Sequence, residues 1–216
     1  QAGDMDPFES VMHGTVEDPR LRGYIYLNDT AIRRIDATNS WDLTRAEMEG
    51  RKQAAQLVNV FRKYIPGGEQ AKLVATAATV GVRESRRIIG DYVLDVHDVL
   101  TCRKCDDGIA RNAFVIDVHD PEKGGNWNPR HLPKGGWHHI PYRCLVPQKA
   151  ENLLVAGRCV SATHEALGSI RVVAQCMAMG QAAGTAAAMA ADQGITPRNI
   201  DVSALQANLK NQGVII

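Results

Sequence analysis

The chain has 216 residues, 44% of them hydrophobic, which is enough for one packed domain or two small ones. Its 25 lysines and arginines nearly balance 24 aspartates and glutamates, so the charge indicates neither a nucleic-acid partner nor an anionic membrane surface. The sequence has no apolar run of membrane-spanning length and no signal peptide, and its five scattered cysteines fit reduced thiols. The compartment stays open, with the cytoplasm favoured.

The N-terminal residues predict a loop followed by a β-hairpin. Residues 1–22 carry glycine, aspartate, proline and glutamate with little periodicity, so we expect a loop there. Residues 24–27 are apolar and aromatic, residues 28–29 form the turn pair Asn-Asp, and residues 31–35 suit a returning strand. This pattern indicates two antiparallel strands.

A helix is predicted from Arg45 to about Tyr64. Thr44 and Glu47 have the spacing of a capping box, and Pro66 follows the last apolar position. The apolar residues recur at helical spacing and should form the buried face, at Ala54, Leu57, Val58, Phe61 and Ile65.

Residues 83–87 concentrate charge in the order Arg-Glu-Ser-Arg-Arg. In an extended strand Arg83, Ser85 and Arg87 share one face. Glu84 and Arg86 then lie on the other face. The segment is either a surface stripe with internal ion pairs, each of little energetic value, or a site for a carboxylate or phosphate, which arginine binds through two hydrogen bonds.

The next segment predicts a strand, a short helix and a pair of cysteines. Residues 88–94 continue the extended pattern, and Asp95 can cap a helix over residues 96–101. Cys102 and Cys105 form a C-x-x-C pair, but the sequence holds no second ligand pair at zinc spacing. We therefore expect two ordinary thiols and no metal.

A strand at residues 114–118 leads into a long run without periodicity, residues 119–139. Its two tryptophans argue against simple disorder, so a functional loop is expected. Besides His119, the run holds three histidines, His131, His138 and His139, with no carboxylate at helical spacing to them. A histidine that hydrogen-bonds a substrate or donates a proton is preferred over a metal ligand.

Residues 140–146 predict an edge strand, because the run contains a proline. Residues 152–156 form a short apolar run that predicts a buried strand, ended by Gly157 and Arg158. A polar bridge over residues 159–169 follows, and it carries two titratable side chains, His164 and Glu165.

A long helix is predicted over residues 171–192, with Ser169 as its N-cap and Gly194 as its C-terminal glycine. It is apolar nearly all round, so it must be covered, and a close neighbour is expected along Gly180, Gly184 and Ala188. Arg171 in the first turn is unfavourable unless a ligand brings negative charge or the side chain folds back onto a carboxylate. A last helix, capped by Asp201 or Ser203, should end near Asn211.

The segment NLLVAGRCVSATHEALGSIRVVAQCMAMGQAAGTAAAMA, residues 152–190, resembles the C-terminal flavin-closing part of FAD-dependent oxidoreductases related to glutathione-reductase-like and fumarate-reductase-like flavoproteins. The resemblance extends to GVRESRRIIGDYVL, residues 81–94, and IPYRCLVP, residues 140–147. It implies an α+β protein: an antiparallel-sheet substrate domain with helices, plus the closing strand and long helix of a Rossmann-like FAD-binding domain.

The same resemblance implies roles for named residues. Gly157 and Arg158 would lie near the FAD diphosphate or ribityl chain, and the helix start would face the isoalloxazine ring through Ser169, Ile170, Arg171 and Val172. Arg83, Glu84 and Arg86 are candidates for binding an anionic substrate or ordering the site. His164 and Glu165 are alternative proton-transfer groups, and each has an equally simple interpretation as a hydrogen-bond partner that fixes the loop.

One feature departs from that family. No Gly-x-Gly-x-x-Gly turn occurs anywhere in the sequence, although it normally holds the ADP half of the cofactor. We therefore expect a C-terminal part that lacks the N-terminal FAD-binding half and is inactive alone. The expected divisions are a partial substrate or cap domain at 1–147, the strand and helix of the FAD-binding domain at 148–194, and a C-terminal helix and tail at 195–216.

Two functions from different classes follow. The first is an FAD-dependent enzyme that transfers hydride between flavin and a small organic substrate, with anionic substrates among the candidates. The alternative is a free-standing, non-enzymatic α+β module that binds a partner protein through the apolar helix 171–192. Because that helix must be covered, a homo-oligomer is also possible in either case. Neither nucleic acid nor a membrane is expected as a partner.

Overall fold

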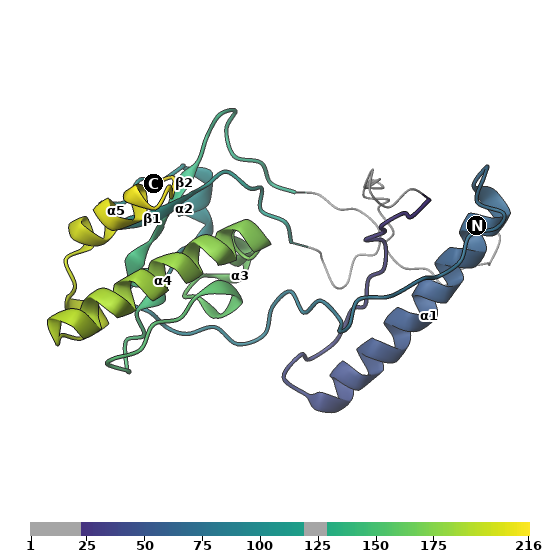
Figure 1. Ribbon diagram of the computed structural model, residues 1–216, viewed down its shortest axis with the longest axis horizontal. Helices are drawn as coiled ribbons and strands as arrows, with labels where there is room; N and C mark the ends of the chain where they lie inside the picture. Colours follow the sequence, from purple (N-terminus) through teal and green to yellow (C-terminus); the bar gives the residue numbers. More distant parts are fainter. Residues whose placement is uncertain (1–22, 119–128) are drawn as a thin grey trace. The chain divides into compact units, whose positions relative to one another are not determined.

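A computed structural model describes residues 23–118 and 129–216. The chain divides into two compact units, whose described parts are residues 23–82 and residues 83–118 with 129–216. Helices predominate, and one small antiparallel sheet of two strands accompanies them (Figure 1). The expected α+β class is therefore confirmed. The loop predicted at residues 1–22 and the first half of the loop predicted at 119–139 lie outside the described residues.

The N-terminal unit is built on helix α1, Ser40–Tyr64. Its N-cap is Asn39, whose side chain accepts hydrogen bonds from the backbone N–H groups of Trp41 and Asp42. The predicted capping box was wrong, because Thr44 lies inside the helix and donates its hydroxyl to the Ser40 carbonyl. A better cap earlier in the chain extends the helix by one turn, and the buried face includes the expected residues Leu57 and Phe61.

The predicted hairpin is absent from the described part of this unit, where residues 24–35 form no strand. The reason lies in the buried side chain of Gln53 on α1. Its amide donates to the Ala31 carbonyl at 3.0 Å and accepts from the Ala31 N–H at 3.1 Å. A side chain thus takes the backbone groups that a second strand would have used.

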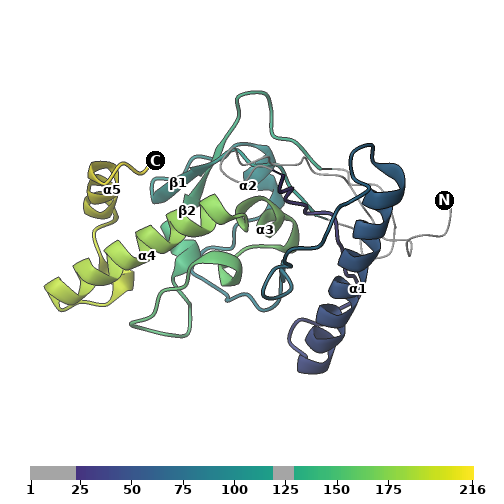
Figure 2. The same ribbon diagram turned by 45° about the vertical axis from the view of Figure 1, so that its right-hand side comes forward.

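The C-terminal unit carries the remaining elements, and its core is the packing of helix α4 against the sheet and the last helix. In both ribbon views α4 runs alongside the two strands (Figure 1, Figure 2). The inner face of α4 is fully buried together with Leu205 and Leu209. Over the described residues, no helix combines the length and apolar character needed to cross a bilayer. In chain order the unit contains α2 Val96–Leu100, β1 Gly108–Asn112, β2 His138–Pro141, η1 Tyr142–Leu145, η2 Gly157–Cys159, α3 His164–Ile170, α4 Val173–Gln193, η3 Pro197–Asn199 and α5 Val202–Asn211.

Caps predicted from local sequence are confirmed in this unit. Asp95 caps α2 with a complete capping box, and Asp201 caps α5 by accepting from the Ser203 and Ala204 N–H groups. Gly194 ends α4 in the left-handed conformation, at φ +64°. These signals are reliable here because a cap depends on groups only two or three residues away.

Most of the predicted strands were wrong. The segments 88–94 and 114–118 contribute only isolated bridges, and residues 152–156 pair with no strand in the described chain. The run predicted at 140–146 becomes the end of β2 followed by η1, and strand β1 was missed. An apolar extended run becomes a strand only where a neighbour supplies a ladder of hydrogen bonds, and that neighbour is not specified locally.

The polar bridge predicted at 159–169 is mostly helix α3, capped by the Thr163 side chain. Ser169 is therefore inside a helix and is not the N-cap of α4, which was a wrong prediction. Arg171 is the C-terminal residue that ends α3, and α4 begins after Val172. The close contact that fixes α3 is at Gly168, where a Cβ would lie 2.8 Å from Val118 Cγ2 and 3.0 Å from the Asp117 carbonyl oxygen.

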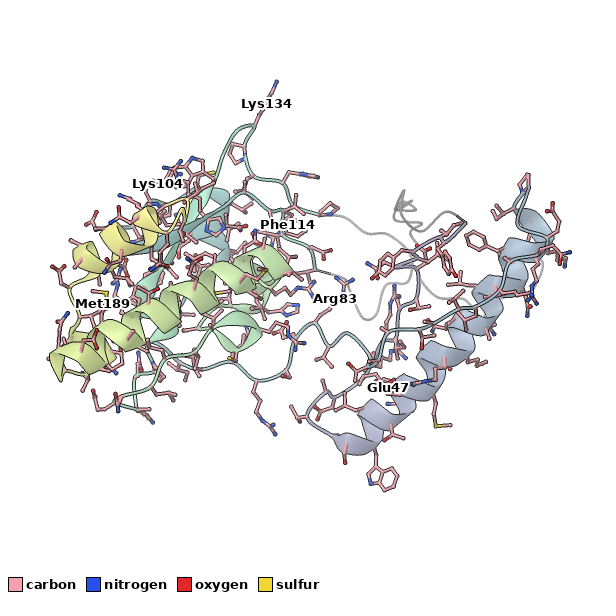
Figure 3. All side chains as sticks on the ribbon, viewed as in Figure 1. Glu47, Arg83, Lys104, Phe114, Lys134 and Met189 are labelled. Atoms are coloured by element: carbon pink, nitrogen blue, oxygen red, sulfur yellow. The ribbon has the colours of Figure 1, made fainter. Side chains whose placement is uncertain are left out.

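Among the described residues of its unit, helix α4 is covered on one side. Met179 is fully buried, whereas Met177 is 69% exposed. Met189 lies against α5, where the Asn208 amide donates to its sulfur at 3.4 Å (Figure 3). No described atom would approach a Cβ at Gly180 or Gly184 within 4 Å, so the expected close neighbour is not among the described residues.

Candidate functional site

Two arginines share one carboxylate just before α4. Arg171, whose side chain is only 10% exposed, donates to the Asp117 carbonyl at 2.5 Å and to its Oδ2 at 3.2 Å. Arg83, which precedes Asp117 in the sequence, donates to the same Oδ2 at 2.9 Å. Burial lowers the pKa of Arg171, and the positive charge of Arg83 lowers it further, against the effect of Asp117.

The Arg171 side chain folds back onto a carboxylate, as one of its two interpretations expected, and its assignment to the cofactor stays a prediction. The charge is not balanced, however. Asp117 meets two guanidinium groups, and Arg158 is near enough that its charge also lowers the pKa of Arg171. The charge of Glu84 acts on Arg171 in the opposite direction, but Glu84 is itself paired with Arg87. Among the described residues, positive charge therefore exceeds negative charge before α4, which favours an anionic ligand. Sequence reasoning missed Asp117, which is 54 positions from Arg171 and carries no local signal.

A second cluster joins residues 83–87 to α3. His164, the first residue of α3, places its Nδ1 at 2.5 Å from Glu84 Oε2. Arg87 reaches the other oxygen of Glu84, Oε1, at 3.1 Å and donates to the Ala162 carbonyl at 2.6 Å. The predicted division into two strand faces was therefore wrong, because Glu84 and Arg87 meet across a non-strand segment. Arg86 is exposed and makes no hydrogen bond or ion pair with the described residues.

Glu165 follows His164 on α3 but has a different partner. Its carboxylate pairs with Arg130, and both side chains are about half exposed. Of the two proton-transfer candidates, His164 is thus connected to the arginine-rich segment and Glu165 is not. Arg130 and Arg87 are further residues that sequence reasoning did not assign.

The predicted cofactor residues lie around the start of α4. Gly157 has φ +81°, a conformation that favours glycine, and the space beside it is open up to Cys176 Sγ at 3.8 Å. Arg158, in η2, is exposed. Val172 is the N-cap of α4 and no side chain caps the helix, so its first N–H groups are available to a polar ligand.

Ser169 and Ile170 are fully buried, so their assignment to the cofactor stays a prediction. The Ser169 hydroxyl donates to the Phe114 carbonyl at 2.6 Å and accepts from the Asn112 amide at 2.7 Å. The Gln175 amide in the first turn of α4 donates to Asn112 Oδ1 at 2.5 Å. This network ties the α3–α4 junction to strand β1 and holds the start of α4 in place.

His138 completes the buried network, since its Nε2 lies 2.8 Å from the Asn112 amide nitrogen. The amide donates, so Nε2 accepts and the proton lies on Nδ1, 2.9 Å from the His139 carbonyl oxygen. Burial lowers the pKa of His138, which agrees with a neutral ring. His138 is therefore a structural residue, whereas the loop interpretation had offered it as a substrate contact.

The cysteine pair shows no sign of a metal centre. Among residues 23–118 and 129–216, no three histidine, cysteine, aspartate or glutamate side chains are grouped to hold a metal ion. Cys102 and Cys105 are free thiols, and burial raises the pKa of Cys105. A raised pKa disfavours the thiolate that metal binding and redox exchange both need.

Comparison with known proteins identifies the family. The family model described as FAD dependent oxidoreductase matches residues 4–209, nearly the whole chain. No curated protein and no solved structure matches significantly. The match spans both arginine clusters, the open start of α4 and the segment on which the sequence resemblance rests. The chain therefore belongs to the FAD dependent oxidoreductase family, whose chemistry is flavin-linked oxidation and reduction.

Proposed function

We propose that this chain is the C-terminal part of an FAD-dependent oxidoreductase that transfers hydride between flavin and a small anionic organic substrate. The observation that carries the proposal is the excess of guanidinium groups beside the uncapped start of α4. Arg83, Arg158 and Arg171 gather there around the carboxylate of Asp117. The other carboxylate whose charge acts on Arg171 is Glu84, which is itself paired with Arg87. Arginine and free helix N–H groups both favour carboxylates and phosphates.

The cofactor would be held by residues on the open side of this cluster. Arg158 and the backbone at Gly157 are available to the diphosphate or ribityl chain, and the first turn of α4 after Val172 to the polar edge of the ring. When bound, FAD supplies the hydride-accepting chemistry, and the chain supplies charge and orientation. Arg83 is half exposed, so it retains hydrogen-bonding groups for a substrate carboxylate.

We further propose that residues outside this chain supply the missing Gly-x-Gly-x-x-Gly unit. Two features of the C-terminal unit support this. Residues 152–156 belong to no described strand and expose Leu153, and the outer face of α4 exposes Val173 and Met177. On this proposal residues 1–147 are part of a substrate domain, and residues 148–194 close the FAD-binding domain.

The test uses the full-length protein that contains this chain. We expect it to retain flavin through gel filtration, measured by visible absorbance. Arg158→Gln should release most of the flavin, whereas Arg198→Gln, which removes an arginine paired with Asp91, should not. Arg83→Gln should raise KM for carboxylate substrates more than for neutral analogues. A colourless full-length protein, or equal flavin retention in both arginine variants, would refute the proposal.

The free-standing binding module is the second candidate, and the exposed outer face of α4 favours it. The two functions predict different oligomeric states and flavin contents. A binding module predicts that the chain is a stable monomer, that its partner binds over Met177, and that no longer form of the protein contains flavin. Light scattering with Met177→Lys, together with the flavin assay above, separates the two.

A further inference from the structure

We propose that Arg87, Glu84 and His164 form one proton-transfer unit, in which His164 is the catalytic acid–base and the other two are positioning residues. The inference rests on the proposed oxidoreductase function and assigns a step that the flavin does not perform. It also selects His164 over its neighbour Glu165.

Both oxygens of the Glu84 carboxylate have partners. Its Oε2 lies 2.5 Å from His164 Nδ1, and its Oε1 lies 3.1 Å from Arg87 Nη2. An ionised carboxylate only accepts hydrogen bonds, so Nδ1 must donate. The proton of the neutral imidazole is then on Nδ1, and Nε2 is left with its lone pair. Because the His164 side chain is 59% exposed, that nitrogen is open to a substrate.

Arg87 joins the carboxylate of Glu84 to the backbone that carries His164. Its Nη1 donates to the Ala162 carbonyl at 2.6 Å, two positions before His164. That backbone is itself held, because the Thr163 N–H donates to the Leu94 carbonyl at 2.8 Å. Arg87 therefore fixes Glu84 relative to α3. A lysine would not reproduce this, since only a guanidinium offers donors to both partners in one plane.

His164 and Glu165 differ in the chemistry of their partners. Glu165 is paired with Arg130, a guanidinium that only donates hydrogen bonds. His164 instead has a carboxylate behind it that orients the ring and stabilises the imidazolium formed when Nε2 takes a proton. This is the logic of carboxylate–histidine pairs in general acid–base catalysis.

In the oxidation of an alcohol or amine, a hydride and a proton leave the substrate for different acceptors. When bound, oxidised FAD would accept the hydride, one proton with two electrons, that leaves the substrate carbon. The O–H or N–H proton leaves for Nε2 of His164, and a C=O or C=N bond forms. The imidazolium, stabilised by Glu84, then releases its proton to water. In the reducing direction His164 donates that proton.

The positioning role is tested on this chain without flavin, by nitrogen NMR of the His164 ring. The wild type should show the Nδ1–H tautomer. Glu84→Ala and Arg87→Met should shift the ring toward the mixture of tautomers found in free histidine. Asp91→Ala is the matched control, because Asp91 is an arginine-paired carboxylate of similar exposure, 28% against 24% for Glu84. An unchanged tautomer in Glu84→Ala would overturn the positioning role.

The catalytic role is tested by rapid reduction of the flavin in the full-length protein. His164→Asn should lower the reduction rate by about a hundredfold or more, with flavin content unchanged. Glu84→Ala should lower it by an intermediate factor, and Asp91→Ala should not lower it. Wild-type reduction by His164→Asn, or a larger loss in Glu165→Gln, would refute the assignment. Absence of flavin in the wild type would instead refute the proposed function and the catalytic step together, while the tautomer result still decides the positioning.

Discussion

Removing the carboxylate of Asp117 should destabilise the C-terminal unit through repulsion between two arginines. Arg83 Nη1 and Arg171 Nη2 lie 2.9 and 3.2 Å from the same oxygen, so they are at most about 6 Å apart. In Asp117→Asn both positive charges stay and the negative charge is lost. At an effective dielectric constant of about 20, two unit charges at that distance repel by about 3 kcal/mol.

Solvent reduces that repulsion, because Arg83 is half exposed although Arg171 is buried. The Asp117 carbonyl still accepts from Arg171 in the variant, which retains one hydrogen bond. We therefore expect Asp117→Asn to lower the free energy of unfolding by about 1–3 kcal/mol. For Asp91→Asn we expect less than about 1 kcal/mol, because the Asp91–Arg198 pair is more exposed than the Asp117–Arg171 pair.

The measurement is urea unfolding followed by the fluorescence of Trp137, which belongs to the C-terminal unit. The other two tryptophans, Trp41 and Trp127, are replaced by phenylalanine so that the signal reports this unit alone. The double variant Asp117→Asn with Arg171→Gln should recover part of the loss, because it removes one of the repelling charges. Repulsion between the two arginines is refuted if Asp117→Asn is no less stable than Asp91→Asn. It is also refuted if the double variant loses more free energy of unfolding than the two single variants lose together.

Three further predictions concern stability, metal and cofactor. Burial raises the pKa of Asp98, but hydrogen bonds from Tyr92 and Arg103 outweigh it, and the net pKa is lowered. Asp98 therefore stabilises the fold above its unfolded pKa of about 4, and that stability should be lost as the pH falls through the lower folded value; Asp98→Asn should flatten this dependence in acid unfolding, and an unchanged slope would contradict it. Met179→Ala should cost about 2–4 kcal/mol and Met177→Ala less than about 0.5, since only the first is buried; equal losses in thermal unfolding would show that the outer face of α4 is covered. The chain alone should bind FAD weakly, and a sub-micromolar FAD affinity measured by fluorescence quenching would contradict this. It should also hold no zinc, and about one zinc per chain that is lost on changing Cys102 and Cys105 to serine would contradict that.

The sequence by itself determined features that depend on neighbouring residues. The caps at Asp95 and Asp201 and the left-handed glycine at Gly194 were predicted correctly, because each interaction spans two to four positions. The family was also identified from residues 152–190, since that segment carries a motif that is specific as a string of residues. The buried positions Leu57 and Phe61 followed from helical spacing.

Only the tertiary structure decided which distant groups meet. Glu84 and His164 are 80 positions apart, and neither residue type signals the other. The predicted hairpin failed because Gln53, 22 positions away, satisfies the backbone of Ala31. Periodicity also could not tell Met177 from Met179 on a helix that is apolar all round, because burial depends on which side the rest of the unit covers. Long-range partners depend on how the whole unit packs, and this packing cannot be predicted from any short segment of the sequence.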